Sequence, residues 1–145
     1  MRKRTMAYLG TCVLLALLVI PPRASAEELA REARKSLRDA SRYLQEISIN
    51  GGYPSRYSGD LQKRYWEGDN RLDEAEIYVQ HPGTPSVGQS FLRAYRATRD
   101  NVHLQGALRA GRALAWGQKQ AGGWDYVAGV KGLEPDGKNE DRDGG

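Results

Sequence analysis

Cysteine, histidine and phenylalanine are scarce in this chain of 145 residues, which has one cysteine, two histidines and one phenylalanine. The cysteine, Cys12, lies within the first 26 residues, so the remainder has no thiol for a disulfide and must be held by its core. The sequence also lacks a metal-binding histidine cluster, a nucleophile triad, a phosphate-binding loop and a dinucleotide fingerprint. His81 and His103 have no visible catalytic partner, and we do not expect either to act as an acid or base.

Acidic residues are absent from residues 1–26, which hold four of the 22 Lys and Arg residues. The remaining 18 bases face 18 acids, so the formal charge of +4 comes from this first segment alone. A nucleic-acid binder releases counterions with a net or clustered cationic surface. The charge balance therefore argues against a nucleic-acid partner.

Residues 1–26 have the three parts of a secretory signal. Arg2-Lys3-Arg4 is followed by an apolar run from Ala7 to Ile20 and then by Ala24-Ser25-Ala26. We predict cleavage after Ala26, a secreted or periplasmic location, and no membrane contact after cleavage. The alternative is a retained membrane anchor, but the run is shorter than the roughly 20 apolar residues that span a bilayer.

The apolar spacing predicts three helices after the signal. The first is amphipathic from Glu28 to Ile49 and stops at Asn50-Gly51-Gly52. The second begins with Thr84 as N-cap and Pro85 at the first helical position, and the third is capped by Asp100 or Asn101. The predicted apolar stripe of the third helix is Leu104, Ala107, Leu108, Gly111, Leu114, Ala115 and Gln118. The last two helices should form an antiparallel hairpin.

Residues 51–83 interrupt the helical period and hold many of the aromatic residues. Short strands are predicted from Tyr53 to Ser58 and from Ile77 to Gln80, and another from Val127 to Val130. From Lys131 to Gly145 the chain is polar and has no apolar period, so we expect residues 127–145 to be a polar tail or the end of an interrupted domain.

Residues 51–83 combine aromatic rings with charged side chains, namely Tyr53, Arg56, Tyr57, Asp60, Arg64 and Trp66. Sugars are bound by such mixtures, because their C–H faces lie on aromatic rings, their hydroxyls donate to and accept from charged side chains, and their carboxylates accept from cationic ones. Trp124, Asp125 and Tyr126 offer the same combination. The alternative is that the rings fill a small core beneath a loop while the charges are solvated.

Three stretches carry a resemblance to a known family. They are Gly51-Gly52-Tyr53-x-x-Arg56-Tyr57-Ser58-x-Asp60-Leu61, the run from Tyr78 to Gly88, and Gly117-Gln118-x-x-x-Gly122-Gly123-Trp124-Asp125-Tyr126. The chain resembles exported bacterial pectate lyases, similar to polysaccharide lyase family 10. The resemblance ends at Tyr126, so residues 27–126 would be the N-terminal part of the lyase-like domain.

This resemblance implies an all-α fold, a partial (α/α) toroid of helical hairpins with short strand-like loops. It also implies β-elimination on polygalacturonate, an acidic plant-type polysaccharide, with calcium as cofactor. The catalytic base matches no residue of this sequence. The implied substrate contacts are Arg56, Tyr57, Asp60, Trp124 and Asp125, with Asp60 also the implied calcium ligand.

Two other functions remain open. A glycoside hydrolase on an α/α toroid would use two carboxylates about 5–9.5 Å apart, for which Asp60 and Asp125 are the candidates. A carbohydrate-binding module would bind the polymer without cleaving it. Gln118 and Trp124 also resemble the QW motif of triterpene cyclases, another α/α toroid, in which the glutamine caps a helix end and the tryptophan stacks on it.

Overall fold

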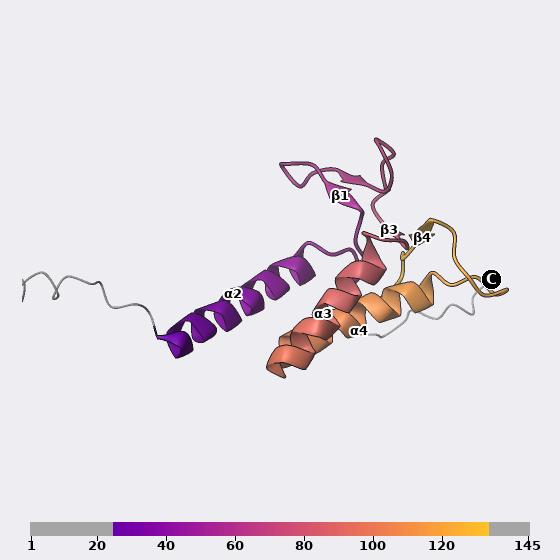
Figure 1. Cartoon of the computed structure of the whole chain (residues 1–145). Coiled ribbons are helices and arrows are strands. Elements are labelled where there is room, and N and C mark those ends of the chain that lie inside the picture. The colour runs from indigo at the N-terminus through magenta and orange to yellow at the C-terminus, as the bar shows by residue number, and fades with distance from the viewer. Residues whose placement is uncertain (1–24, 134–145) are drawn as a thin grey trace, which may run out of the picture. The chain divides into compact units, whose positions relative to one another are not determined.

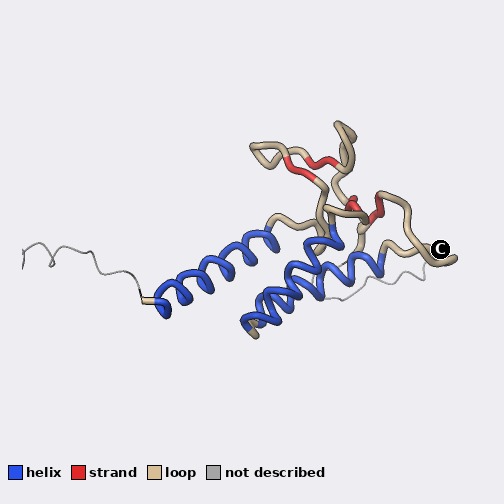
Figure 2. The backbone as a smooth tube through the Cα atoms, viewed as in Figure 1, coloured by secondary structure: helices blue, strands red, loops and turns tan. Residues whose placement is uncertain are grey.

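A computed structural model describes residues 25–133 of the chain (Figures 1 and 2). The chain divides into two compact units, Met1–Ala33 and Arg34–Gly145. Within the described residues there are three helices, α2 (Ala26–Glu46), α3 (Thr84–Thr98) and α4 (Asn101–Trp116), and four short strands. The mainly helical class predicted from the sequence is therefore confirmed for this part of the chain. Most of the predicted signal and most of the predicted tail lie outside the described residues.

Helix α2 confirms the first predicted helix, with ends two to three residues earlier. Glu27 and Glu28 lie in its first turn, where carboxylates oppose the positive end of the helix dipole. After the helix, Gly51 adopts φ 86°, and a Cβ there would lie 2.5 Å from the carbonyl oxygen of Arg109. Only a glycine fits this turn without strain, which explains the stop.

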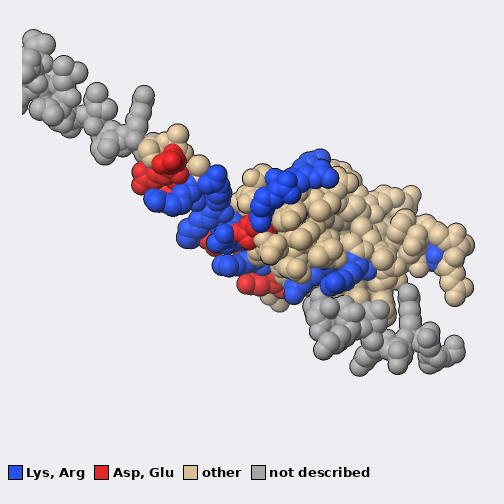
Figure 3. Space-filling model, turned by 90° about the horizontal axis from the view of Figure 1, so that it is seen from below, with Lys and Arg blue, Asp and Glu red and all other residues tan. Residues whose placement is uncertain are grey.

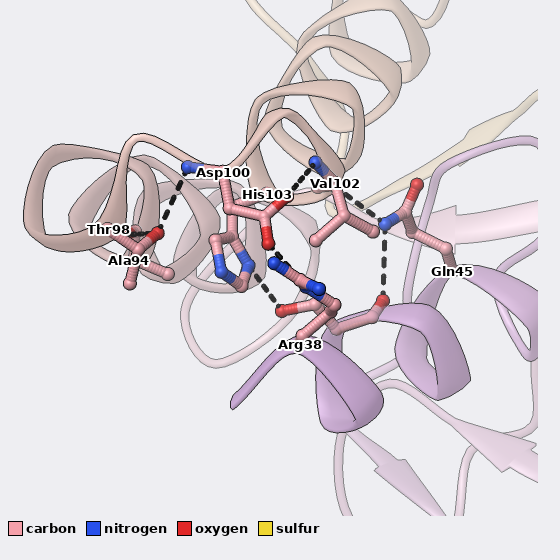
Figure 4. A network of polar contacts seen from close by, with 8 residues as sticks. Arg38, Gln45, Ala94, Thr98, Asp100, Val102 and His103 are labelled. Atoms are coloured by element: carbon pink, nitrogen blue, oxygen red, sulfur yellow. Dashed lines mark hydrogen bonds and ion pairs between the residues drawn. The ribbon is translucent and has the colours of Figure 1, made fainter. Parts of the chain in front are cut away.

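The apolar stripe of α2 is largely uncovered. Ser41 is the helix's buried residue, whereas Leu29 and Leu37 are 57% and 38% exposed. From Arg34 onward the helix contacts α4 through polar groups. Gln45 Nε2 donates to the carbonyl of Val102 at 2.9 Å, and the Ser41 hydroxyl and His103 Nδ1 are 2.7 Å apart. Figure 4 shows this network around the N-terminus of α4.

The helical hairpin of α3 and α4 is confirmed, with one correction at its start. Gly83, not Thr84, is the N-cap, and no side chain caps the helix. The Thr84 hydroxyl instead donates to the carbonyl of Tyr53 at 3.2 Å and accepts from its N–H at 3.0 Å. Thr84 is fully buried, so this local pair satisfies polar groups that water cannot reach. At α4 the predicted cap is confirmed, because the Asp100 side chain accepts from the N–H of Val102.

The face of α4 that packs on α3 differs from the predicted stripe. The buried residues of α4 are His103, Gly106, Ala110 and Ala113, whereas Leu108 is 43% exposed. The reason is close approach: a Cβ on Gly106 would lie 2.9 Å from the Phe91 ring, so the ring fits only against a glycine. Helices α3 and α4 thus pack through the small residues of α4, and its leucines lie outside this contact.

The strands form two antiparallel pairs. β1 (Arg56–Tyr57) pairs with β2 (Arg64–Tyr65), and β3 (Glu76–Tyr78) pairs with β4 (Val127–Gly129). The predicted strands correspond to β1, β3 and β4, whereas β2 was not predicted. The second pair forms part of the core of Ile77, Ala113, Ala128, Val130 and Leu133. This pairing brings residues 51–83 beside the segment that follows α4 (Figure 1).

Candidate functional site

Arg56 lies in the β1–β2 hairpin and is held by its surroundings. Its Nη2 donates to the carbonyl of Gly68 at 2.6 Å and to Asp69 Oδ1 at 3.3 Å. The guanidinium also lies 4.2 Å from the centroid of the Tyr65 ring, a cation–π distance. Arg56 therefore fixes the loop that follows β2, and half of its side chain stays exposed.

Tyr57 anchors the same hairpin to the end of α2. Its hydroxyl donates to the carbonyl of Ile47 at 3.1 Å, and burial raises its pKa to about 12. The phenol is therefore neutral at physiological pH, and its polar end is already occupied. The Tyr57 side chain is half-buried and is not part of the buried core.

Asp60 shapes the exposed turn between β1 and β2. Its Oδ1 accepts from the Ser58 hydroxyl at 2.6 Å and from the N–H of Gln62 at 3.1 Å, and these hydrogen bonds lower its pKa. Across residues 25–133 no three His, Cys, Asp or Glu side chains gather into a group that could hold a metal ion. Calcium binding at Asp60 therefore remains an expectation that only the family resemblance implies.

Trp124 closes the C-terminal end of α4. The turn before it places Gly122 and Gly123 at φ 79° and 76°, which glycine adopts freely. The indole Nε1 then donates to the carbonyl of Leu114 at 2.7 Å, a carbonyl that the helix itself leaves free. In this chain the tryptophan, not Gln118, caps the helix by its side chain, and 46% of Trp124 remains exposed.

The two segments rich in aromatic residues meet at an aromatic cluster of Trp66, Tyr78 and Tyr126. The Trp66 and Tyr126 rings are stacked, with centroids 6.3 Å apart and planes at 29°, and the Trp66–Tyr78 distance is also 6.3 Å. Tyr126 is 55% exposed. The N–H of Val79 donates to the carbonyl of Tyr126 at 3.0 Å and so extends the β3–β4 pairing toward the cluster.

An acidic residue adjoins this cluster. The Tyr78 hydroxyl donates to Glu67 Oε1 at 2.9 Å, and burial together with the Glu67 carboxylate raises the pKa of Tyr78. Sequence reasoning noted Trp66 and Tyr126 but selected Trp124 instead. The alignment of Tyr78 with Val127 across two strands, 49 positions apart, was the missing information.

Asp125 lies at a pocket of ≈ 600 Å³ beside the C-terminal end of α4. Its Oδ1 is 2.6 Å from Lys119 Nζ, and both side chains are more than half exposed. The residues that line this pocket are Trp116, Gly117, Gln118, Lys119, Gln120, Asp125, Val127, Ala128 and Gly129. The structure thus separates the predicted contacts into three places: the β1–β2 hairpin, the α4 cap and this pocket.

The two histidines have different surroundings. His103 is fully buried at the contact between α2 and α4, and within the described structure its Nε2 has no hydrogen-bond partner. His81 is exposed, with Nδ1 2.7 Å from the Ser86 hydroxyl.

No family model matches the sequence, and no curated protein or solved structure matches it significantly. The candidate site therefore rests on the residues and their geometry. Among the helices of the described chain, none is both long enough and apolar enough to cross a membrane.

Proposed function

We propose that the chain acts as an exported polysaccharide lyase of the pectate type, which cleaves polygalacturonate by β-elimination. The observation that carries the proposal is the stacked pair Trp66 and Tyr126, which joins the aromatic segment of residues 51–83 to the end of the stretch of residues 117–126 that resembles the family. The α3–α4 hairpin supports it too, since helical hairpins are the unit from which an (α/α) toroid is built.

The chemistry of the aromatic cluster suits a polysaccharide. The exposed face of Tyr126 offers an apolar platform for the C–H face of a sugar ring, and its stacking on Trp66 limits the rotation of that platform. An ordered platform costs less conformational entropy on binding than a mobile side chain. Glu67, held by Tyr78, would accept hydrogen bonds from sugar hydroxyls or orient a bound cation.

The elimination step needs groups beyond this platform. A base removes the proton next to the uronate carboxylate, and cations stabilise the negative charge that develops on that carboxylate. The electron pair then forms a carbon–carbon double bond as the glycosidic C–O bond at the β carbon breaks, and the leaving oxygen takes up a proton. We assign no described residue as the base. Arg56 donates through Nη2 to Gly68 and Asp69, so in this arrangement it holds the loop.

The test uses the full chain with polygalacturonate and calcium. Lyase activity generates an unsaturated uronide that absorbs in the ultraviolet. We expect the wild-type chain to bind the polymer, and Tyr126→Ala to weaken that binding by roughly tenfold because a stacking platform is lost. Tyr43→Ala is the matched control, because Tyr43 is 49% exposed on α2 and lies outside the cluster.

The products decide between the reaction classes. New reducing ends without ultraviolet absorbance would establish hydrolysis in place of elimination. Polymer binding without either product would establish a carbohydrate-binding role. Equal binding by wild type, Tyr126→Ala and Tyr43→Ala would remove the aromatic cluster as the binding surface.

A further inference from the structure

The pocket at the end of α4 is chemically distinct from the aromatic cluster. Its volume of ≈ 600 Å³ falls in the range of small-molecule sites. The amides of Gln118 and Gln120 line it, and each amide can both donate and accept hydrogen bonds. Close packing fixes its floor, because a Cβ on Gly117 would lie 2.6 Å from the Cβ of Ala128.

The two charged residues that line the pocket have opposite signs, so their formal charges sum to zero. Of its lining residues only Lys119 and Asp125 are charged, and their Nζ and Oδ1 atoms are 2.6 Å apart. Lys119 also lies in the turn that follows α4, where its N–H donates to the carbonyl of Gly123 at 3.1 Å. This backbone bond fixes the turn from which the Lys119 side chain extends to Asp125, and both side chains remain accessible to a ligand.

The position of the pocket disfavours an anion. Trp116 is the last residue of α4, so the pocket lies at the helix C-terminus, where the macrodipole is negative. An entering carboxylate would also face the Asp125 carboxylate. A neutral ring with adjacent hydroxyls meets no such repulsion, since one hydroxyl can donate to Asp125 while its neighbour accepts from Lys119.

We propose that this pocket is a subsite for a neutral sugar ring, in which Lys119 and Asp125 bind adjacent hydroxyls and the two glutamines bind the others. The subsite rests on the proposed function in so far as that function makes a polysaccharide the ligand. The subsite would add specificity for neutral sugars to the specificity for uronates, because the bound polymer would contain neutral rings beside its uronates. Lys119 and Asp125 are then the residues that determine specificity.

The test compares galactobiose with digalacturonate, two disaccharides that differ in a hydroxymethyl group against a carboxylate. Each is titrated into the full chain and followed through the backbone amide signals of Gly117, Lys119 and Gly129 by NMR. We expect galactobiose to shift these signals and to bind at least about tenfold more tightly than digalacturonate, the scale of one charge-assisted hydrogen bond.

Two substitutions should change the preference in opposite directions. Asp125→Asn removes the repulsive carboxylate and leaves Lys119 as an unopposed cation, so the preference should move toward digalacturonate. Lys119→Met leaves the carboxylate alone, so binding of digalacturonate should disappear and that of galactobiose should fall about tenfold. Asp39→Asn and Lys35→Met are the matched controls, because this pair is also exposed, is 2.7 Å apart and lies on α2.

The outcomes separate the subsite from the proposed function. Preference of the wild-type chain for digalacturonate at these amides, or no shift with either sugar, would overturn the subsite, even if polygalacturonate still binds through Tyr126. Galactobiose binding that responds to the pocket variants but not to the α2 variants would establish it. That result would stand even where the polygalacturonate experiments fail.

Discussion

Helix α2 and the α3–α4 hairpin have similar sequence patterns but different surroundings. Each helix has an amphipathic repeat. In the hairpin the repeat is used for packing, because Phe91 is 2% exposed against Gly106. In α2 the leucines stay exposed and polar groups make the contact with α4 (Figure 4). An amphipathic period therefore predicts a helix, but it does not predict which face of that helix packs against the rest of the protein.

The distribution of charged residues on the surface also differs between α2 and the rest of the described chain. On the face seen in Figure 3, Lys, Arg, Asp and Glu side chains crowd along α2, whereas a broad part of the remaining surface carries no charge. Four of the α2 charges pair within the helix itself, Lys35 with Asp39 at 2.7 Å and Arg31 with Glu28 at 3.8 Å. Arg38 instead reaches across to Asp100 at the start of α4. Exposed pairs contribute little stability, so most of the packing energy should come from the hairpin and the core.

The largest effect is expected from the hairpin. Phe91→Ala should lower the free energy of unfolding by about 3–5 kcal/mol, because a buried ring is replaced by a cavity. Leu29→Ala on α2 should change it by less than about 0.5 kcal/mol, since that side chain is 57% exposed. Urea denaturation measures both, and equal losses would show that the α2 stripe is covered in solution.

A smaller loss is expected where α2 meets α4. Ser41→Ala removes the hydroxyl beside His103 Nδ1 and leaves a buried ring whose Nε2 already lacks a partner among the described residues. The free energy of unfolding should fall by about 1–3 kcal/mol. Ser36→Ala on the exposed side of α2 should be neutral within about 0.5 kcal/mol. Faster hydrogen exchange in α2 for Ser41→Ala alone would localise the effect, and a neutral Ser41→Ala would show that the contact carries no stability.

The smallest effect is a dependence on pH. The N–H of Val102 and then Arg38 lower the pKa of Asp100 from its ordinary value of 3.8. Folding therefore favours the carboxylate, and its contribution is present above about pH 4 and lost as the pH falls through the lowered pKa. Asp100→Asn should flatten the acid limb of the urea midpoint. Arg38→Met should flatten it less, because the larger cause remains. An unchanged slope in Asp100→Asn would assign the acid loss to other carboxylates.

The two Gly-Gly-aromatic turns show how far local sequence reaches. The first was predicted to end a helix, and Gly51 adopts a left-handed φ, as Gly122 and Gly123 do in the second turn, although α4 already ends at Trp116. The aromatic residues that follow differ, since Tyr53 is 2% exposed and Trp124 is 46% exposed. The turn depends on neighbouring residues, whereas burial depends on what the rest of the chain places against the ring.

The candidate site shows the same division. The sequence singled out Asp125 as a candidate contact, and the structure places this residue at the edge of a pocket. Sequence reasoning did not foresee that Tyr57 donates to Ile47 or that Tyr126 stacks on Trp66. Hydrogen bonds and ring contacts between distant segments depend on strand register, which the short strands of this chain do not reveal.

The sequence by itself determined the three helices, the glycine turns and the Asp100 cap, because these depend on residues within a few positions of one another. Only the tertiary structure decided which face of α4 is buried, how α2 is held, and that residues 66 and 126 meet. The physical reason is that burial and contact require two surfaces. A periodic pattern specifies one surface, and the partner is chosen by the closest packing that the folded chain allows.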